Sequence, residues 1–183
     1  MIKYIILNGP PGSGKTSISI ELVRALRQEI GYPDAVVSDS FSAPLKHFFA
    51  AALAEKYAQM NKDMPRAELS GRSVRQGLIG LAEDHCKAVY GDDVFGKWLV
   101  FRSLKHPHKQ PYFVVIDDGG FPDEIGAVPN RFVIRVTRYG KDFKDDSRGY
   151  VDPWHHHLDN DGTFAETWVK VGALAKLIVG LDR

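Results

Sequence analysis

A phosphate-binding loop near the start of the sequence carries its clearest chemistry. Residues 9–16 read GPPGSGKT and complete the pattern G-x-x-x-x-G-K-[ST]. In this pattern the glycines turn backbone N–H groups inward around phosphates, the lysine supplies a positive charge to the β and γ oxygens, and the last hydroxyl can ligate Mg²⁺. The segment therefore predicts binding of ATP with Mg²⁺. The predicted nucleotide-binding residues are Gly9, Pro10, Pro11, Gly12, Ser13, Gly14, Lys15 and Thr16.

A second magnesium ligand is expected at the end of a buried strand next to this loop. Asp117 and Asp118 follow the apolar run 112–116 and therefore occupy such a position. An aspartate there could instead cap a helix or form a turn. Because Thr16 already supplies one oxygen for Mg²⁺, we interpret one of the two aspartates as a further ligand, and the sequence leaves open which one.

The same two aspartates raise the alternative of a GTP-driven switch. Asp117-Asp118-Gly119-Gly120 fits the D-x-x-G pattern of GTP-hydrolysing proteins. The guanine-reading motif N-K-x-D is missing, because the segment NKDM at 61–64 has its aspartate one residue early. The sequence therefore disfavours a GTPase switch.

A kinase also needs an acceptor pocket and cations near the transferred phosphoryl group. Asp39 and Phe41 follow the second predicted strand, at the edge where ligands of open α/β sheets bind. We expect Asp39 to orient or deprotonate an acceptor hydroxyl and Phe41 to stack on a base, although a capped turn and a core phenylalanine would also explain them. Arg72 and Arg75 are spaced to share one helical face, from which they could grip an anionic acceptor or simply remain solvated.

The charged, irregular segment 138–153 is a candidate lid. It opens with Arg138 and also carries Lys141, Lys144 and Arg148 among several aspartates. A segment of this kind could close over phosphates, which makes Arg138 a candidate for stabilising charge during transfer. A solvated surface loop is the competing interpretation.

Hydrophobic periodicity predicts the elements that position these residues. The predicted strands are 2–7, 35–38, 112–116 and 132–136, and the predicted helices are 17–31, 44–57, 71–90, 92–104 and 163–181. Strands that alternate with helices predict an α/β fold with three layers, in which helices cover both faces of a mostly parallel sheet. Since the sequence has 183 residues, 44% hydrophobic content and no linker or repeat, we expect a single domain over 1–183.

Bulk composition places few limits on partners. The net charge of +1 neither indicates nor excludes a polyanionic partner, because a local basic groove can bind nucleic acid on a neutral protein. Cys86 is the one cysteine, so no internal disulfide can form. The sequence has no signal-peptide pattern and no apolar stretch near the roughly 20 residues of a membrane helix, so we expect a cytoplasmic protein without a membrane partner. The oligomeric state is left open, with a homodimer among the options.

Several segments together resemble the deoxynucleoside monophosphate kinases of tailed bacteriophages, a branch of the P-loop kinases. The matching segments are GPPGSGKT at 9–16, FSAPLK at 41–46, RQ at 75–76, YGDD at 90–93, FPDE at 121–124, IRVTR at 134–138 and NDGT at 160–163. The resemblance implies a P-loop kinase fold and a location in the cytoplasm of an infected bacterial host. It also implies that Lys15 and Thr16 bind ATP and Mg²⁺, and that Arg75 and Arg138 lie near the acceptor or transferred phosphate.

The NDGT segment has two interpretations. From the residues alone, 160–163 is a turn that caps the last predicted helix. By the resemblance, the same segment, with Asn160 and Gly162, lies beside the adenine of ATP. The capping role is sufficient to explain the segment, and a contact with the nucleotide base is the other interpretation.

One departure from the family pattern bears on the acceptor. Members usually carry an arginine between the strand-end aspartate and the Phe-Pro pair, where this sequence has Gly119-Gly120. The same branch is similar to kinases that phosphorylate the hydroxymethyl group of 5-hydroxymethyluracil in DNA, where the acceptor is an alcohol on a flipped or single-stranded base. DNA binding would suit a basic run and two aromatic residues, although such charge also serves solubility. These residues are Arg102, Lys105, His106, His108, Lys109, Trp98 and Trp154.

The sequence thus predicts an ATP-dependent kinase with a deoxynucleotide acceptor. A free deoxynucleoside monophosphate is the first expectation, and a DNA base bearing a hydroxymethyl group is the alternative. A different class remains, an ATPase without an acceptor whose output is a conformational change in a partner.

Overall fold

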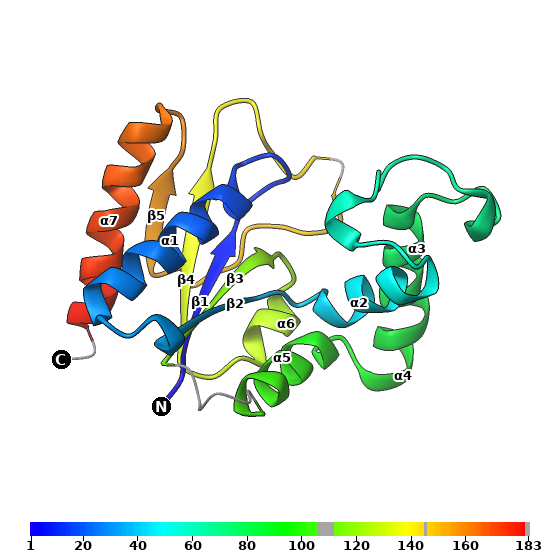
Figure 1. Ribbon diagram of the computed structural model, residues 1–183, viewed down its shortest axis with the longest axis horizontal. Coiled ribbons are helices and arrows are strands. Elements are labelled where there is room, and N and C mark those ends of the chain that lie inside the picture. The colour runs from blue at the N-terminus through cyan, green and yellow to red at the C-terminus, as the bar shows by residue number, and fades with distance from the viewer. Residues whose placement is uncertain (106–111, 145, 182–183) are drawn as a thin grey trace.

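Five parallel strands form the central sheet of the computed structural model, which describes residues 1–105, 112–144 and 146–181. The strands are β1 (Lys3–Asn8), β2 (Val36–Asp39), β3 (Phe113–Gly119), β4 (Arg131–Thr137) and β5 (His156–Asp159). Their order is β2-β3-β1-β4-β5, and every neighbouring pair is parallel (Figure 1). The predicted α/β class is therefore confirmed, and β1 lies at the centre of the sheet.

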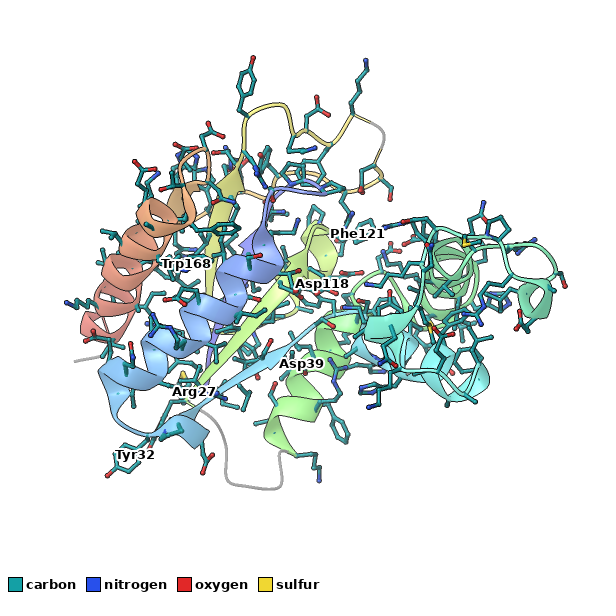
Figure 2. All side chains as sticks on the ribbon, turned by 45° about the horizontal axis from the view of Figure 1, so that its top comes forward. Arg27, Tyr32, Asp39, Asp118, Phe121 and Trp168 are labelled. Carbon is teal, nitrogen blue, oxygen red and sulfur yellow. The ribbon has the colours of Figure 1, made fainter. Side chains whose placement is uncertain are left out.

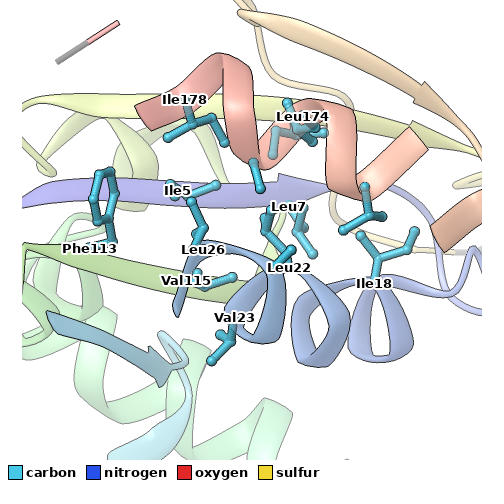
Figure 3. Packing of buried hydrophobic residues seen from close by; sticks show 14 of the residues in the cluster. Ile5, Leu7, Ile18, Leu22, Val23, Leu26, Phe113, Val115, Leu174 and Ile178 are labelled. Atoms are coloured by element: carbon cyan, nitrogen blue, oxygen red, sulfur yellow. The ribbon is translucent and has the colours of Figure 1, made fainter. Parts of the chain in front are cut away.

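Two long helices cover one face of this sheet. These are α1 (Lys15–Ile30) and α7 (Phe164–Gly180), which lie side by side (Figure 1). Side chains alternate along a strand, so Ile5 and Leu7 of β1 point into this layer, where they pack with Leu22 of α1 and Leu174 of α7 (Figure 3). Burial of each such side chain contributes roughly 1.5–3 kcal/mol, so this layer fixes β1 against α1 and with them the loop that joins the two.

The opposite face of the sheet is covered by α5 (Val94–Leu104) and α6 (Pro122–Gly126). Tyr4 and Ile6, the alternate residues of β1, belong to a second buried cluster with Leu99 of α5 and Ile125 of α6. Helices therefore cover both faces, which confirms the predicted three-layer architecture.

A smaller helical region extends beyond the carboxyl end of β2. It contains α2 (Ala43–Ala52), α3 (Val74–Gly80) and α4 (Ala88–Tyr90), together with the 3₁₀ turns Tyr57–Gln59 and Ala67–Leu69 (Figure 1). A further 3₁₀ turn, Pro33–Ala35, precedes β2. Phe49, Met60 and Val74 form the small core of this region. Partly buried residues, among them Leu53 and Leu78, pack against this core.

The predicted helix 71–90 begins later than expected and is not α-helical throughout. Ser73 is its N-cap and forms a capping box with Gln76, while Ser70 and Gly71 have left-handed backbone torsions with φ of 54° and 79°. From Val74 the chain stays helical to Tyr90, but its middle, Leu81–Lys87, is a π-helix. Such segments are rare and occur frequently at functional sites.

Four other elements differ from the prediction. The helix expected over 44–57 ends at Ala52, because Ala54 has a φ of 48° that an α-helix cannot contain. Neither β5 nor α6 was predicted, since both are too short to show a period. β3 continues past its predicted end at residue 116 and includes both Asp117 and Asp118.

The last helix follows the prediction closely. Thr163 caps α7, and Glu166 completes a capping box with it, as the NDGT turn indicated. Among the described residues, no helix combines the length and the apolar character needed to cross a membrane.

Candidate nucleotide and acceptor site

The phosphate-binding loop joins the end of β1 to the start of α1. Gly12 and Gly14 have φ of 75° and 92°, which residues with side chains rarely adopt. Gly14 is the N-cap of α1, and no side chain in the described part of the chain caps that end by a hydrogen bond. The first-turn N–H groups, with the positive end of the helix dipole, therefore face the loop as an anion site. This geometry fits the phosphates of ATP.

Close packing explains other residues of the loop. A Cβ on Gly9 would lie 2.4 Å from the carbonyl oxygen of Val136, so only glycine fits there. The carbonyl oxygen of Pro10 accepts a hydrogen bond from the Ser13 N–H at 3.2 Å, and Pro11 is exposed. Ser13 is fully buried, and its hydroxyl has no hydrogen-bond partner among the described residues. These contacts hold the loop in place and leave the buried Ser13 hydroxyl available for another hydrogen-bond partner.

Lys15 lies folded over the loop. Its Nζ donates hydrogen bonds to the carbonyl oxygens of Gly9 at 2.6 Å and Pro10 at 2.8 Å. Burial, and next the positive charge of Arg148, lower the pKa of Lys15 to about 8, against the attraction of nearby aspartates. At neutral pH the ammonium therefore remains charged, and it is crowded by a second cation that a bound polyanion would neutralise.

Asp117 and Thr16 meet across the mouth of the loop. The Thr16 hydroxyl donates to Asp117 Oδ2 at 2.9 Å, linking the first turn of α1 to β3. Hydroxyl and carboxylate oxygens are ligands that Mg²⁺ accepts, and two of them converge here beside the phosphate site. The residues present therefore fit a magnesium ion.

The Asp118 carboxylate binds the start of α2 rather than Thr16. Its carboxylate accepts hydrogen bonds from the N–H groups of Phe41 at 2.8 Å and Ser42 at 3.2 Å, and from the Ser42 hydroxyl at 2.6 Å. Lys46 Nζ lies 3.6 Å from its Oδ2. Because adjacent strand residues point to opposite sides, only Asp117 of this pair faces Thr16. Asp118 instead holds the start of α2 against β3.

Asp39 ends β2 opposite Ile116 of β3, two residues before Asp118, and both aspartates lie toward the carboxyl edge of the sheet (Figure 2). Arg102 of α5 binds it, with Nη2 at 3.1 Å from each carboxylate oxygen and at 2.9 Å from the Ser40 carbonyl oxygen. Sequence reasoning missed this pair, since nothing in the local pattern links residues so far apart. Its role toward an acceptor stays a prediction, but Asp39 is not a free carboxylate.

A cavity of about 340 Å³ opens between the end of β2 and the start of α2. Asp39, Ser40, Lys46, His47 and Asp117 are among the residues that line it. Lys46 was not singled out from the sequence, and its Nζ contacts the Ser40 hydroxyl at 2.9 Å. The cavity shares Asp117 with the magnesium site, so a molecule bound there would lie next to the phosphates.

The structure corrects the assignment of Phe41. Its side chain is only 2% exposed and belongs to the buried cluster that also contains Leu45 and Ile116. A ring with no open face cannot stack on a base. Phe41 therefore packs in the core, and its backbone, rather than its ring, touches the site through Asp118.

The assumed shared helical face of Arg72 and Arg75 is also wrong. Arg72 precedes the N-cap of α3 and therefore lies outside the helix, whereas Arg75 lies in the first turn. Arg75 Nε is 2.5 Å from Asp63 Oδ1, and both side chains are largely exposed. An acceptor role for Arg75 stays a prediction.

The candidate lid has two parts with different attachments. Arg138 is exposed and reaches the loop, with Nη1 3.4 Å from the Gly12 carbonyl oxygen. By contrast, the Asn8 side chain donates to the Gly149 carbonyl oxygen at 2.9 Å and accepts from the Val151 N–H at 2.9 Å. The later part of 138–153 is therefore attached to the end of β1 and does not form a free lid. Asp145 lies outside the described residues.

Asn160 supports the phosphate-binding loop from the side of β5. Its Nδ2 donates to the Ser13 carbonyl oxygen at 2.8 Å, and its Oδ1 accepts from the Thr167 hydroxyl at 2.8 Å. A Cβ on Gly14 would lie 2.3 Å from this Nδ2. Gly162 is exposed in the turn before α7. Contacts of these residues with adenine stay predictions, but Asn160 is adjacent to the loop.

The features offered for DNA binding are partly used inside the protein. Arg102 binds Asp39, and Trp98 is half-buried against Phe95, with ring centroids 5.5 Å apart. Trp154 is 42% exposed and stacks with the Arg135 guanidinium at 5.2 Å. Lys105 lies near the Phe101 ring, while His106, His108 and Lys109 lie outside the described residues.

Comparison of the chain with protein-family models gives no match, and comparison with curated protein sequences gives none either. The function of the protein is therefore inferred from the geometry of the site.

Proposed function

We propose that this protein is an ATP-dependent kinase that transfers the γ-phosphoryl group to a deoxynucleoside monophosphate. The observation that carries the proposal is the position of Asp117. It contacts Thr16 of the phosphate-binding loop and also lines the polar cavity beyond β2. A phosphate donor site and an acceptor-sized cavity thus share one carboxylate, as direct transfer between two bound substrates requires.

The roles of the residues follow from their positions. The loop amides and Lys15 hold the β- and γ-phosphates, and Thr16 and Asp117 hold Mg²⁺, which neutralises charge on those phosphates when bound. An acceptor oxygen attacks the γ-phosphorus, and the bond from that phosphorus to the β–γ bridging oxygen breaks, leaving ADP. Lys46 lines the cavity beside Asp117 and provides positive charge there, and we assign Arg75 to the acceptor phosphate. Catalysis consists of positioning and charge stabilisation.

The environment of Asp39 favours a phosphate acceptor over an alcohol. An alcohol must lose a proton as it attacks, whereas a phosphate monoester, with a second pKa near 6, already carries an ionised oxygen at neutral pH. Arg102 donates hydrogen bonds to both carboxylate oxygens of Asp39, so this carboxylate is engaged within the protein and not directed at an acceptor hydroxyl. This supports a free nucleotide rather than 5-hydroxymethyluracil in DNA. The cavity beyond β2 supports a kinase over an ATPase without an acceptor, because only a kinase needs a second binding site beside the phosphates.

A transfer assay with γ-labelled ATP and Mg²⁺ tests the proposal. The four deoxynucleoside monophosphates are offered in parallel with duplex DNA that contains thymine or 5-hydroxymethyluracil, and Lys15→Ala serves as the inactive control. Label in a deoxynucleoside diphosphate is the expected result. Label confined to the hydroxymethylated DNA would assign the alternative acceptor, and label released only as inorganic phosphate would reject a kinase.

A further inference from the structure

Arg148 lies directly over Gly120, the residue that follows β3. A Cβ placed on Gly120 would lie 2.5 Å from Cδ of Arg148, 2.8 Å from its Cγ and 2.9 Å from its Cβ. Real Cβ atoms do not approach other atoms so closely, so no other residue type fits at 120 while Arg148 keeps this position. The Arg148 side chain therefore occupies the space left by the missing side chain of Gly120.

The backbone around Arg148 is fixed to the sheet. The Gly149 N–H donates to the Gly120 carbonyl oxygen at 3.2 Å, and the Gly149 carbonyl oxygen accepts from the Asn8 side chain at 2.9 Å. Asn8 is itself fully buried at the end of β1, immediately before the phosphate-binding loop. Arg148 is thus carried by a segment that is attached to the end of β1 and to the residue that follows β3.

The charges around Arg148 indicate what it is placed to bind. Asp146 holds the guanidinium through Nε at 2.7 Å and Nη2 at 2.5 Å. Arg148 lies over Gly120, three residues after Asp117, and its segment is attached to Asn8, the residue immediately before the phosphate-binding loop. The ion pair of Arg148 and Asp146 therefore lies beside this loop. A bound triphosphate would supply far more negative charge at the same place.

We propose that Arg148 is a preplaced phosphate-binding residue of the nucleotide site and that Asp146 is its counter-ion until phosphate oxygens replace it. This inference rests on the proposed ATP site, but it concerns a residue that the loop pattern does not include. Because Gly120 sets its position, Arg148 and Gly120 act as one unit. The guanidinium is expected to contact the γ-phosphate end of the nucleotide, since Gly120 lies just past Asp117, the strand-end residue that faces Thr16 at the proposed magnesium site.

Binding measurements test this without any acceptor. The affinities of the folded protein for Mg·ATP and Mg·ADP are measured by titration calorimetry for the wild type, Arg148→Ala, Arg148→Lys and Gly120→Ala. Arg24→Ala is the matched control, because Arg24 of α1 also pairs with a nearby carboxylate, that of Glu21, away from the site. Circular dichroism and thermal melting confirm that each variant is folded.

We expect Arg148→Ala to weaken ATP binding by roughly 10- to 100-fold and ADP binding much less, since charge-assisted hydrogen bonds of this kind have that worth. Arg148→Lys should recover part of the loss because it keeps the charge. Gly120→Ala should reproduce the selective loss, because its methyl group displaces Arg148 without removing it. Arg24→Ala should keep the wild-type ratio.

An unchanged ratio of ATP to ADP affinity in Arg148→Ala would overturn the inference, as would a wild-type protein that binds ATP no more tightly than ADP. The two proposals fail separately. If Arg148 governs ATP preference but no acceptor is ever labelled, the inference holds and the kinase assignment falls. If labelled diphosphate forms and Arg148→Ala keeps the wild-type ratio, the kinase stands and this inference falls.

Discussion

The Thr16 hydroxyl donates a hydrogen bond to Asp117 at 2.9 Å, and this contact joins the first turn of α1 to β3. The next residue, Asp118, has its carboxylate occupied by two backbone N–H groups and a hydroxyl at the start of α2. Two adjacent aspartates of β3 therefore bind different elements of the protein. The first lies between the phosphate-binding loop and the polar cavity beyond β2, and the second holds the start of α2, which lines that cavity.

This division predicts opposite effects of two similar substitutions. Asp117→Asn should reduce phosphoryl transfer by at least about 100-fold and raise the Mg²⁺ concentration needed for half-maximal activity, because it removes a charged ligand. Its free energy of unfolding should change little. Asp118→Ala should lower the free energy of unfolding by about 1–3 kcal/mol, since it leaves the Phe41 N–H without its acceptor.

Steady-state kinetics against Mg²⁺ and urea unfolding of both variants check this division. Equal losses of stability in the two variants would contradict it. So would a normal Mg²⁺ requirement in Asp117→Asn.

The lowered pKa of Lys15 predicts a pH dependence of nucleotide binding. In the proposed site Lys15 binds phosphates as the ammonium, and burial, followed by the charge of Arg148, lowers its pKa in the free protein to about 8. ATP affinity should therefore fall as the pH rises above 8, while in Lys15→Met it should be weak and nearly independent of pH. Transfer activity of Lys15→Met should be lost by orders of magnitude.

The same shift predicts the direction of a stability change. The unfolded state retains the proton on Lys15 up to a pKa of 10.5, whereas the folded state releases it near 8. Stability from this group therefore rises as the pH increases between these values. The free energy of unfolding is measured for the wild type and for Lys15→Met at several pH values between 7 and 10. A difference between the two proteins that does not change with pH would contradict the prediction.

The sequence predicted the parts of the site that depend on local pattern. The loop, its flanking strand and helix, and the cap at Thr163 each follow from consecutive residues, and the α/β order follows from hydrophobic periods. It could not choose between Asp117 and Asp118, because the choice depends on which side of β3 faces α1. Phe41 was misassigned for a similar reason, since only the packing of α2 against the sheet shows that its ring is buried.

The pairs that complete the site were beyond local pattern altogether. Asp39 and Arg102 are 63 positions apart, and they meet only because α5 packs beside β2. Arg148 is held at Gly120 because the neighbouring Gly149 hydrogen-bonds both Gly120 and the Asn8 side chain. Hydrophobic periodicity cannot predict such contacts. The glycines at 119 and 120 appeared to be the loss of a cation, whereas in the structure Gly120 is the place where one is seated.

A buried acid on the far side of the site predicts a second pH effect. Glu124 of α6 is 4% exposed, and burial raises its pKa to about 7 despite Lys87, whose Nζ lies 3.3 Å away. The folded state therefore holds the proton more firmly than the unfolded state does. The stability from this group is complete below pH 4.5 and is lost as the pH rises toward 7.

Glu124→Gln should remove that dependence. The difference in free energy of unfolding between variant and wild type should change by on the order of 1–3 kcal/mol between pH 4.5 and 7.5, in favour of the variant at the higher pH. Chemical unfolding at several pH values measures it. A constant difference would mean that Lys87 keeps Glu124 ionised throughout.

Asp39 offers a test of the chemistry at the acceptor side. If the attacking oxygen is already ionised, as on a deoxynucleoside monophosphate, no proton has to be removed and Asp39 acts only through its place beside Arg102. Asp39→Asn keeps an oxygen acceptor for Arg102, so kcat should fall by less than about 10-fold, with most of the effect on KM for the acceptor. A general base would instead cost roughly 100- to 10,000-fold in kcat. Arg102→Ala supplies the comparison, because it leaves Asp39 unpaired and should alter acceptor KM at least as strongly. A large loss of kcat in Asp39→Asn with normal KM would identify Asp39 as a base and would direct the search back to an alcohol acceptor.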